Sequence, residues 1–283
     1  MRLPKRKYFQ KMQNELSNFK RRISYPFLYL GGMVFLTMSG YCAEAGKPII
    51  MAHRGASADC PENTLSAIME AAKQKATVVE FDVRQTSDGT LILFHDKTFE
   101  RFTGKKDNVE DQTWEAIKDT DVGSWFTGGK FKGEKMPLFE NALKLCFELG
   151  ITPLIEHKTG TAAAYAKVIA DLDCGDKVIV QSFSWSFLKA FQKEMPDVKL
   201  GALGSKELTA KRYAEIKEFS PDWVGWAFSD LTAANLTALQ KDGFLVTLWT
   251  INKTEDAQKW MDLGVDGIIT DRPGVMLDLV GGN

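Results

Sequence analysis

The sequence is poor in cysteine and histidine and carries almost no net charge. Four cysteines in 283 residues are too few for a disulfide scaffold. Basic and acidic residues number 36 and 37, so the net charge is -1 and the chain lacks the excess of positive charge typical of a dedicated nucleic-acid-binding protein. Hydrophobic residues make up 44% and charged residues 26%, as in a packed globular protein. A disordered chain and a multi-span membrane protein are therefore excluded.

The near-zero charge averages two unlike parts of the chain. Residues 1–22 hold eight basic side chains and one acidic side chain, a net charge of +7, which leaves -8 for the rest. An uncharged, mostly apolar stretch follows at 23–41, and then comes Ala43-Glu44-Ala45, which resembles a signal-peptidase site. A basic segment, an apolar segment and small residues in this order are typical of a secretory signal. We therefore predict that residues 1–45 export the protein.

Two other roles for this leader remain open. Its basic segment is long for a signal, so residues 23–41 could stay as a membrane anchor with the basic end in the cytoplasm. Cys42 also allows a lipoprotein. In each case residues 46–283 lie outside the cytoplasm, in the periplasm or the extracellular medium. Contact with a membrane is expected only through the N-terminal segment, if it is uncleaved.

From residue 47 onward, short apolar runs typical of strands alternate with amphipathic segments typical of helices. The predicted strands are 48–53, 78–86, 152–157, 177–183, 199–203, 222–227, 244–251 and 266–270. The predicted helices include 62–75, 162–172, 184–195, 209–219, 232–241 and 254–263. Eight such units in roughly 235 residues predict an α/β fold, a (β/α)8 TIM barrel. The alternative, an open doubly wound sheet, normally has a glycine-rich phosphate loop after its first strand, and this sequence has none there.

One segment interrupts the repeat. Residues 91–95 are predicted to extend the second strand, and 97–136 is predicted to be an insertion that forms a small cap beside the barrel mouth. The insertion contains the aromatic residues Phe99, Phe102, Trp114, Trp125, Phe126 and Phe131. We expect them to form the core of the cap. If they instead surrounded the mouth, they would favour lipid substrates.

Carboxylates cluster at the ends of the second and third predicted strands. Glu80 and Asp82 lie two residues apart and share one strand face, and Glu156 ends the neighbouring strand. Three carboxylates facing into a barrel repel one another unless a cation binds them. Oxygen ligands favour a hard ion, Mg²⁺ or Ca²⁺. The alternative is a buried salt-bridge network with Arg54 and Lys158, which would contribute little stability.

The three histidines of the chain, His53, His95 and His157, all lie at predicted strand ends. His53 and His95 could serve as a general acid–base pair beside the metal. His157 lies on the opposite strand face from Glu156, so we expect it to point outward. A metal, cationic side chains and two histidines suit the chemistry of a phosphoryl group.

Several motifs carry a family resemblance. HRG at 53–55 and PENT at 61–64 are followed by E-x-D at 80–82, HD at 95–96, E-x-K at 156–158, QSF at 181–183 and WTIN at 249–252. Together they resemble the glycerophosphodiester phosphodiesterases, in the short bacterial type with an N-terminal export signal or anchor. The resemblance covers residues 48–277 and implies a metal-dependent TIM barrel that hydrolyses glycerophosphodiesters to glycerol 3-phosphate and an alcohol.

The resemblance also implies roles for individual residues. The metal ligands would be Glu80, Asp82 and Glu156, the acid–base pair His53 and His95, and the phosphate-binding residues Arg54 and Lys158. Glu62 would line the substrate pocket through hydrogen bonds, and Trp249 would pack against glycerol or, alternatively, within the barrel core. Phospholipase-D-like hydrolysis of lysophospholipids and a non-catalytic binding barrel are the competing functions. The expected partner is a small molecule, and the sequence leaves the oligomeric state open.

Overall fold

The computed structural model describes residues 47–281 of the chain. The predicted export segment, 1–45, lies outside the described residues. Among the described residues, no helix combines the length and the apolar character needed to cross a membrane.

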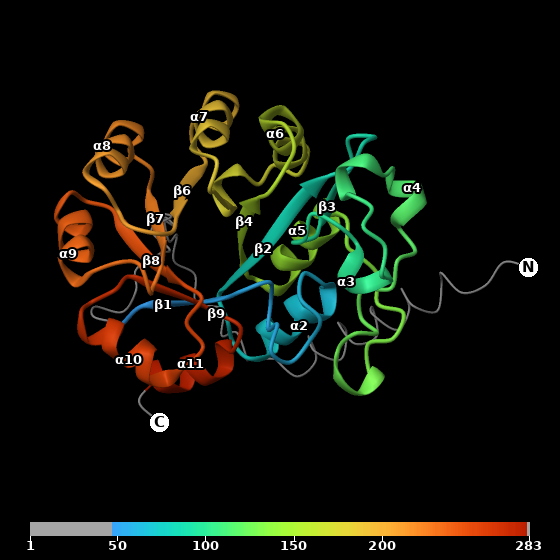
Figure 1. Ribbon diagram of the computed structural model, residues 1–283, viewed down its shortest axis with the longest axis horizontal. Coiled ribbons are helices and arrows are strands. Elements are labelled where there is room, and N and C mark those ends of the chain that lie inside the picture. The colour runs from blue at the N-terminus through green and yellow to red at the C-terminus, as the bar shows by residue number, and fades with distance from the viewer. Residues whose placement is uncertain (1–46, 282–283) are drawn as a thin grey trace, which may run out of the picture. The chain divides into compact units, whose positions relative to one another are not determined.

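Eight parallel strands close into a barrel (Figure 1). They are β1 (Ile49–Ala52), β2 (Val78–Gln85), β4 (Thr152–His157), β5 (Ile179–Ser182), β6 (Lys199–Gly204), β7 (Trp223–Ala227), β8 (Leu245–Trp249) and β9 (Gly267–Thr270). Each strand pairs in parallel with the next strand of the barrel, and β1 pairs with both β2 and β9, which closes the ring. The predicted TIM barrel is confirmed, and the strand bounds differ from the predicted ones by at most two residues at either end.

Helices surround the barrel and follow its strands. They are α2 (Leu65–Lys73), α5 (Phe139–Leu149), α6 (Ala162–Asp171), α7 (Trp185–Glu194), α8 (Ala210–Phe219), α9 (Ala233–Lys241), α10 (Thr254–Asp262) and α11 (Pro273–Gly281). Hydroxyl side chains start several of them: Thr161, Thr209 and Thr232 each accept a hydrogen bond from the backbone of the first turn. Local capping therefore fixes where these helices begin.

One helix starts later than predicted. The sequence pattern places a helix at 62–75, whereas α2 begins at Leu65, with Thr64 as its N-cap. Asn63 takes a left-handed backbone conformation, with φ 57°. Its side chain bonds to Asp82 on β2, and this tertiary contact holds PENT as a loop against the strand.

The barrel interior has an apolar lower layer and an upper layer that is polar on β2 and β4 and largely apolar on β6 and β8. Met51, Val78, Leu154, Ile179, Trp223 and Ile269 pack together as the lower layer. Two residues further along each strand, the inward side chain belongs to the upper layer, as with Glu80 on β2 and Glu156 on β4. Phe81, between Glu80 and Asp82 in the sequence, points outward. It packs edge-to-face on Phe139 of α5, with ring centroids 6.3 Å apart. The alternation of the strands therefore delivers polar groups to the carboxyl end of the barrel.

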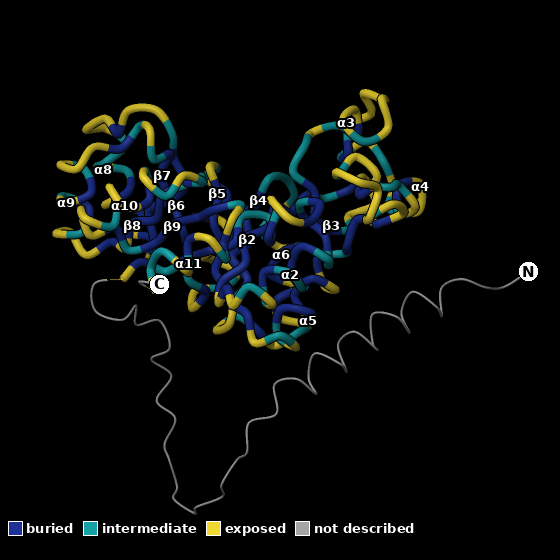
Figure 2. The backbone as a smooth tube through the Cα atoms, turned by 90° about the horizontal axis from the view of Figure 1, so that it is seen from below, coloured by how far each residue is buried: buried dark blue, intermediate teal, exposed yellow. Residues whose placement is uncertain are grey.

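The insertion lies to one side of the barrel strands (Figure 2). It follows β3 (Leu91–Leu93), which pairs antiparallel with β2, and contains α3 (Glu100–Thr103), η1 (Val109–Asp111), α4 (Trp114–Ile117) and η2 (Thr127–Gly129). It has its own small core, which includes Phe99 and the partly buried Phe102 and Trp114, as predicted. Trp125, Phe126 and Phe131 depart from the prediction: they lie outside this core, and Trp125 is 42% exposed. Trp125 stacks edge-to-face between Phe102 and Phe126, beside this core.

Candidate active site

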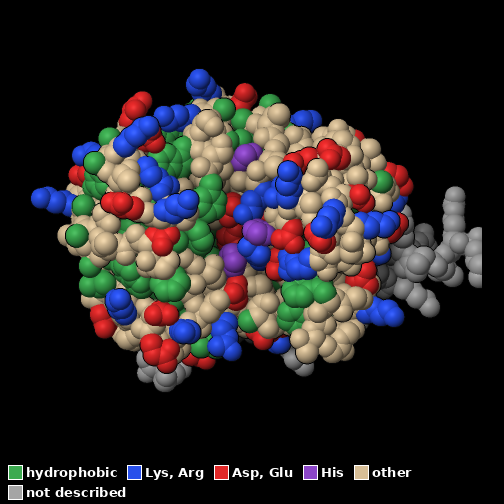
Figure 3. Space-filling model, in the orientation of Figure 1, with side chains coloured by type: hydrophobic (Ala, Val, Ile, Leu, Met, Phe, Trp, Pro, Cys, Tyr) green, Lys and Arg blue, Asp and Glu red, His purple; other side chains and the backbone are tan. Residues whose placement is uncertain are grey.

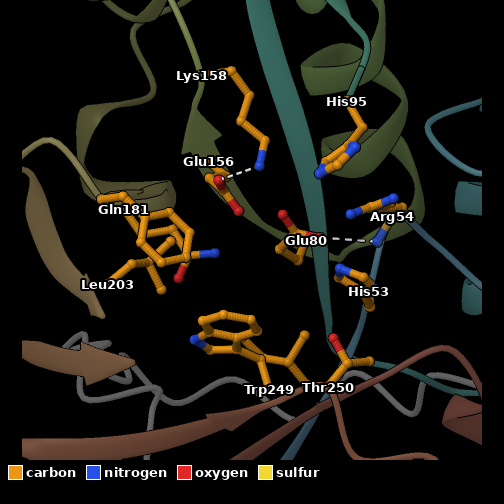
Figure 4. A pocket seen from close by; sticks show the side chains of 12 residues that line it. His53, Arg54, Glu80, His95, Glu156, Lys158, Gln181, Leu203, Trp249 and Thr250 are labelled. Atoms are coloured by element: carbon orange, nitrogen blue, oxygen red, sulfur yellow. Dashed lines mark hydrogen bonds and ion pairs between the residues drawn. The ribbon is translucent and has the colours of Figure 1, made fainter. Parts of the chain in front are cut away.

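The polar ends of the strands meet in one cavity of about 200 Å³ (Figure 4). Most of the residues singled out from the sequence line it: His53, Arg54, Glu80, His95, Glu156, Lys158 and Trp249. Figure 3 shows histidine, acidic and basic side chains gathered in the hollow at the centre of this face. Asp82 lies deeper, fully buried beside Glu80 and Glu156.

The HRG segment depends on its glycine. Gly55 has φ 83°, and a Cβ there would lie 2.6 Å from Ala67 of α2. Because glycine has no Cβ, the backbone at residue 55 can pass close to α2 and turn there. In this conformation the amide of Arg54 donates to Glu80 Oε2 at 2.9 Å. Gly55 is therefore required by geometry, and the segment that contains it connects the end of β1 to the acidic cluster.

The acidic cluster joins β2 and β4. One carboxylate oxygen each from Glu80, Asp82 and Glu156 lies within 4.8 Å of the others. Burial and the neighbouring charges of Asp82 and Glu156 raise the pKa of Glu80 well above its ordinary value. Burial and Asp82 likewise raise the pKa of Glu156 to about 7, against the opposing effect of Lys158. The cluster therefore holds more negative charge than its own surroundings neutralise.

Asp82 differs from its two neighbours. Burial would raise its pKa, but the charges of Arg54 and Lys158 and a hydrogen bond from Asn63 lower it below the ordinary value. Arg54 Nε lies 3.0 Å from Asp82, and Lys158 Nζ lies 3.1 Å from it. The salt-bridge network considered from the sequence therefore exists, and it accounts for Asp82.

That network leaves Glu80 incompletely satisfied. Its Oε1 atom is buried and has no hydrogen-bond partner among the described residues. A buried carboxylate without a partner is costly unless a cation binds it or a proton neutralises it. Three converging carboxylates, one with an unpaired oxygen, fit a hard divalent cation. The described residues thus contain a cluster able to hold a metal ion.

A carboxylate orients each of the two cavity histidines. His53 Nδ1 lies 2.6 Å from Asp271 Oδ1, and Asp271 also accepts hydrogen bonds from Ser57 and Asn252. Burial opposes ionisation of Asp271, but the hydrogen bond and charge of His53 outweigh it and hold the pKa of Asp271 at about 2. A proton shared at Nδ1 leaves Nε2 of His53 free for a ligand.

His95 has a matching arrangement. Its Nδ1 lies 2.9 Å from Asp96 Oδ1. Burial lowers the pKa of His95, although Asp82 acts in the opposite direction. The sequence alone indicated no role for Asp96 or Asp271. Asp96 directly follows His95, and Asp271 follows β9, the strand that pairs with β1, a proximity that spacing in the sequence does not reveal.

A chain of ion pairs connects the two sides of the cavity. Glu62 accepts hydrogen bonds from Arg54 at 3.0 Å and from Arg101 at 2.6 Å. Arg101 also donates to Asp96 at 2.8 Å. Glu62 lies outside the main cavity and lines an adjoining one that shares His53 and Arg54. Arg101, on α3 of the insertion, was not anticipated from the sequence.

Two further residues complete the comparison with the sequence. His157 faces away from the cavity, as expected from its position in the strand, and its ring stacks on Phe187 with centroids 3.4 Å apart. Its nitrogens meet Ser182 Oγ and the carbonyl of Gly160. Trp249 lines the cavity and also packs edge-to-face on Phe183, so it belongs to the wall of the site and to the barrel core.

Comparison with known proteins identifies this arrangement. The family model for the glycerophosphoryl diester phosphodiesterase family matches residues 53–275, a span that includes both oriented histidines and the acidic cluster. The chain belongs to the glycerophosphoryl diester phosphodiesterase family. As a family member it is an enzyme, a phosphoric diester hydrolase that acts on glycerophosphodiesters.

Relatives of similar length support the assignment. A glycerophosphodiester phosphodiesterase of Caldanaerobacter subterraneus is 32% identical over 240 residues, covering 83% of this chain and 98% of the relative. A putative glycerophosphodiester phosphodiesterase of Bacillus subtilis is 31% identical, covering 81% of this chain and 96% of its own. The solved structure of an Oleispira antarctica phosphodiesterase, in complex with sn-glycerol-3-phosphate, has the same fold. Its TM-score is 0.78 at 24% identity, covering 84% of this chain and 98% of that one.

Proposed function

We propose that this family member hydrolyses glycerophosphodiesters to glycerol 3-phosphate and an alcohol by metal-assisted acid–base catalysis. One observation carries the proposal. Two histidines, each oriented by a carboxylate, face a single cavity whose acidic side holds a buried carboxylate oxygen without a partner. Such a site offers proton transfer and a place for a cation within the same small volume.

Glu80, Asp82 and Glu156 would hold the cation, Mg²⁺ or Ca²⁺. When bound, a divalent ion supplies charge that neutralises the non-bridging oxygens of a phosphodiester as the transition state develops. Arg54 and Lys158 line the same cavity and would bind these oxygens from the protein side. Their present partners, Asp82, Glu62 and Glu156, keep both cations in place before substrate arrives.

The histidines would move the protons. Because burial lowers the pKa of His95, this ring is neutral near pH 7 and suited to accept a proton from the attacking hydroxyl or water. His53 would then protonate the leaving oxygen. Asp271 would stabilise the protonated ring of His53, and Asp96 would hold His95 in the tautomer whose Nε2 accepts.

The opposite wall would receive the glycerol moiety. Trp249 and Phe183 form an edge-to-face pair there, with ring centroids 5.4 Å apart. Flat apolar surfaces suit the carbon face of a small polyol. The cavity of about 200 Å³ suits a deacylated headgroup better than a lipid with acyl chains. This size favours glycerophosphodiesters over lysophospholipids as substrates.

The experiment is product release by the full-length chain. We expect glycerol 3-phosphate from glycerophosphocholine and glycerophosphoethanolamine in Mg²⁺ or Ca²⁺, and little or none after treatment with EDTA. Re-addition of the metal should restore the rate. Full activity in EDTA would overturn the metal assignment. Release of glycerol 3-phosphate from neither substrate would overturn the proposed reaction and would favour a binding barrel.

A further inference from the structure

The cavity wall opposite the acidic cluster is largely apolar, and one carboxamide interrupts it. Phe183, Leu203 and Trp249 supply most of this wall. Gln181 lies among them near the end of β5, and its side chain points into the cavity (Figure 4). Since an apolar surface gives an amide nothing to bond with, its placement here needs a physical reason.

The carboxamide of Gln181 borders the cavity and has no protein partner among the described residues. The residue is only 4% exposed. Its side chain makes no hydrogen bond with any other residue in the range 47–281. Ser182, the next residue in the chain, is paired with His157, whereas Trp249 Nε1 on the same wall also has no partner among the described residues. Since the amide faces the open space of the cavity and no described residue bonds to it, a group of the substrate is its expected partner.

Neighbouring strands leave room for this side chain and for a ligand. Gly201 and Gly225 occupy inward positions on β6 and β7. A Cβ on Gly201 would lie 3.0 Å from Gln181 Cβ, and one on Gly225 would lie 2.6 Å from Leu203 and 3.9 Å from Gln181 Oε1. Side chains at these two positions would crowd the carboxamide. The bare backbone therefore keeps the space around Gln181 open.

The chemistry of the surroundings defines the ligand group. Arg54, Lys158 and the acidic cluster, where the phosphate would bind, line the other side of the cavity. The part of the substrate that reaches Gln181 is then a group esterified to the phosphate rather than the phosphate itself. A carboxamide both donates and accepts hydrogen bonds, as a hydroxyl group does, whereas an alkyl chain offers neither. We propose that Gln181 binds a hydroxyl group of the glycerol moiety and so determines the selectivity of the site for a polyol. This inference rests on the proposed function.

The test compares two phosphate monoesters that differ only in hydroxyl groups. Binding of glycerol 3-phosphate and of propyl phosphate is measured by titration calorimetry at a fixed metal concentration. The wild-type chain should prefer glycerol 3-phosphate by at least about tenfold, equivalent to about 1.4 kcal/mol. Gln181→Met should abolish the preference while binding propyl phosphate as the wild type does. Gln192→Met, on the exposed side of α7, is the matched control and should leave both affinities unchanged.

Other results would overturn the inference. Equal weakening of both ligands in Gln181→Met would mean that the residue acts through the fold or the metal. An unchanged preference in that variant, or no preference in the wild type, would mean that the hydroxyl groups are not recognised by Gln181. Failure of the proposed reaction is distinct from these results, because it appears as absent turnover of glycerophosphocholine by the wild type.

Discussion

At the scale of single residues, the site depends on the different surroundings of chemically similar groups. Three buried carboxylates of one cluster have different partners: Asp82 has two cations and an amide, whereas Glu80 has one backbone amide and a free oxygen. The histidines differ in the same way. His53 and His95 face the cavity, and His157 packs against an aromatic ring outside it.

Replacing either cavity histidine should remove most of the turnover. We expect His53→Ala and His95→Ala each to lower kcat by about 10²–10⁴-fold, the usual contribution of a general acid or base. Steady-state kinetics on glycerophosphocholine, with circular dichroism to confirm folding, measures the effect. Near-normal kcat in either variant would contradict the acid–base assignment.

His157→Ala should have the opposite profile. We expect kcat to stay within about threefold of the wild type, because the ring does not line the cavity. The melting temperature should fall, since the change removes a stacked ring and two buried hydrogen bonds. A large loss of kcat with an unchanged melting temperature would show that this residue takes part in the reaction.

His157 should also make stability depend on pH. Burial lowers the pKa of His157 to about 4, so the folded protein resists a proton that the unfolded chain binds below about pH 6.5. Its contribution is therefore complete above about pH 6.5 and is lost as the pH falls towards 4, by an amount on the order of 3 kcal/mol. Denaturant unfolding of the wild type and His157→Gln across this range measures it. Parallel pH profiles would refute the prediction.

At the scale of elements, several side chains couple the insertion to the barrel: Glu110 pairs with Arg84 of β2, and Arg101 reaches the loops at the cavity mouth. Arg101 of α3 bonds to Glu62 and Asp96, and its guanidinium lies 4.5 Å from the ring centroid of Phe102 and 5.0 Å from that of Trp125. Glu62 and Asp96 in turn contact Arg54 and His95. The insertion thereby supports groups on two different loops of the mouth.

Arg101→Met should lower kcat/KM by roughly 10- to 100-fold, because hydrogen bonds to charged groups contribute about 1.5–3 kcal/mol each. Arg212→Met is the matched control. Arg212 also lies over aromatic rings, 4.3 Å from the centroid of Trp226, but it does not line the cavity. Equal kinetics for the two variants would show that Arg101 does not position the catalytic loops.

At the scale of the whole molecule, we expect the N-terminal segment and the barrel to have separate tasks. We propose that residues 1–45 direct export and that the barrel acts outside the cytoplasm. The proposal is supported by the +7 charge of the first 22 residues followed by an apolar stretch. Residues 1–46 lie outside the described part of the chain, so only a cellular experiment can test this.

Fractionation of cells that produce the full chain with a C-terminal tag provides that experiment. A cleaved signal predicts soluble protein in the periplasm or the medium, with a new N-terminus at Gly46. An anchor predicts full-length protein in the membrane fraction. Full-length soluble protein in the cytoplasm would contradict export in every form.

The sequence determined the barrel, because period-two and helical patterns repeat eight times. It also determined which strand faces carry Glu80, Asp82 and Glu156, because alternation along a strand is a local property. Tertiary structure decided the partners. His53 bonds to Asp271, which is 218 positions away in the sequence. Asn63, predicted to lie in a helix, lies in a loop and bonds to Asp82. Arg101 of the insertion bonds to Glu62. The contact between His53 and Asp271 depends on closure of the ring, which brings the last strand beside the first. No local pattern encodes which charges then lie close enough to interact.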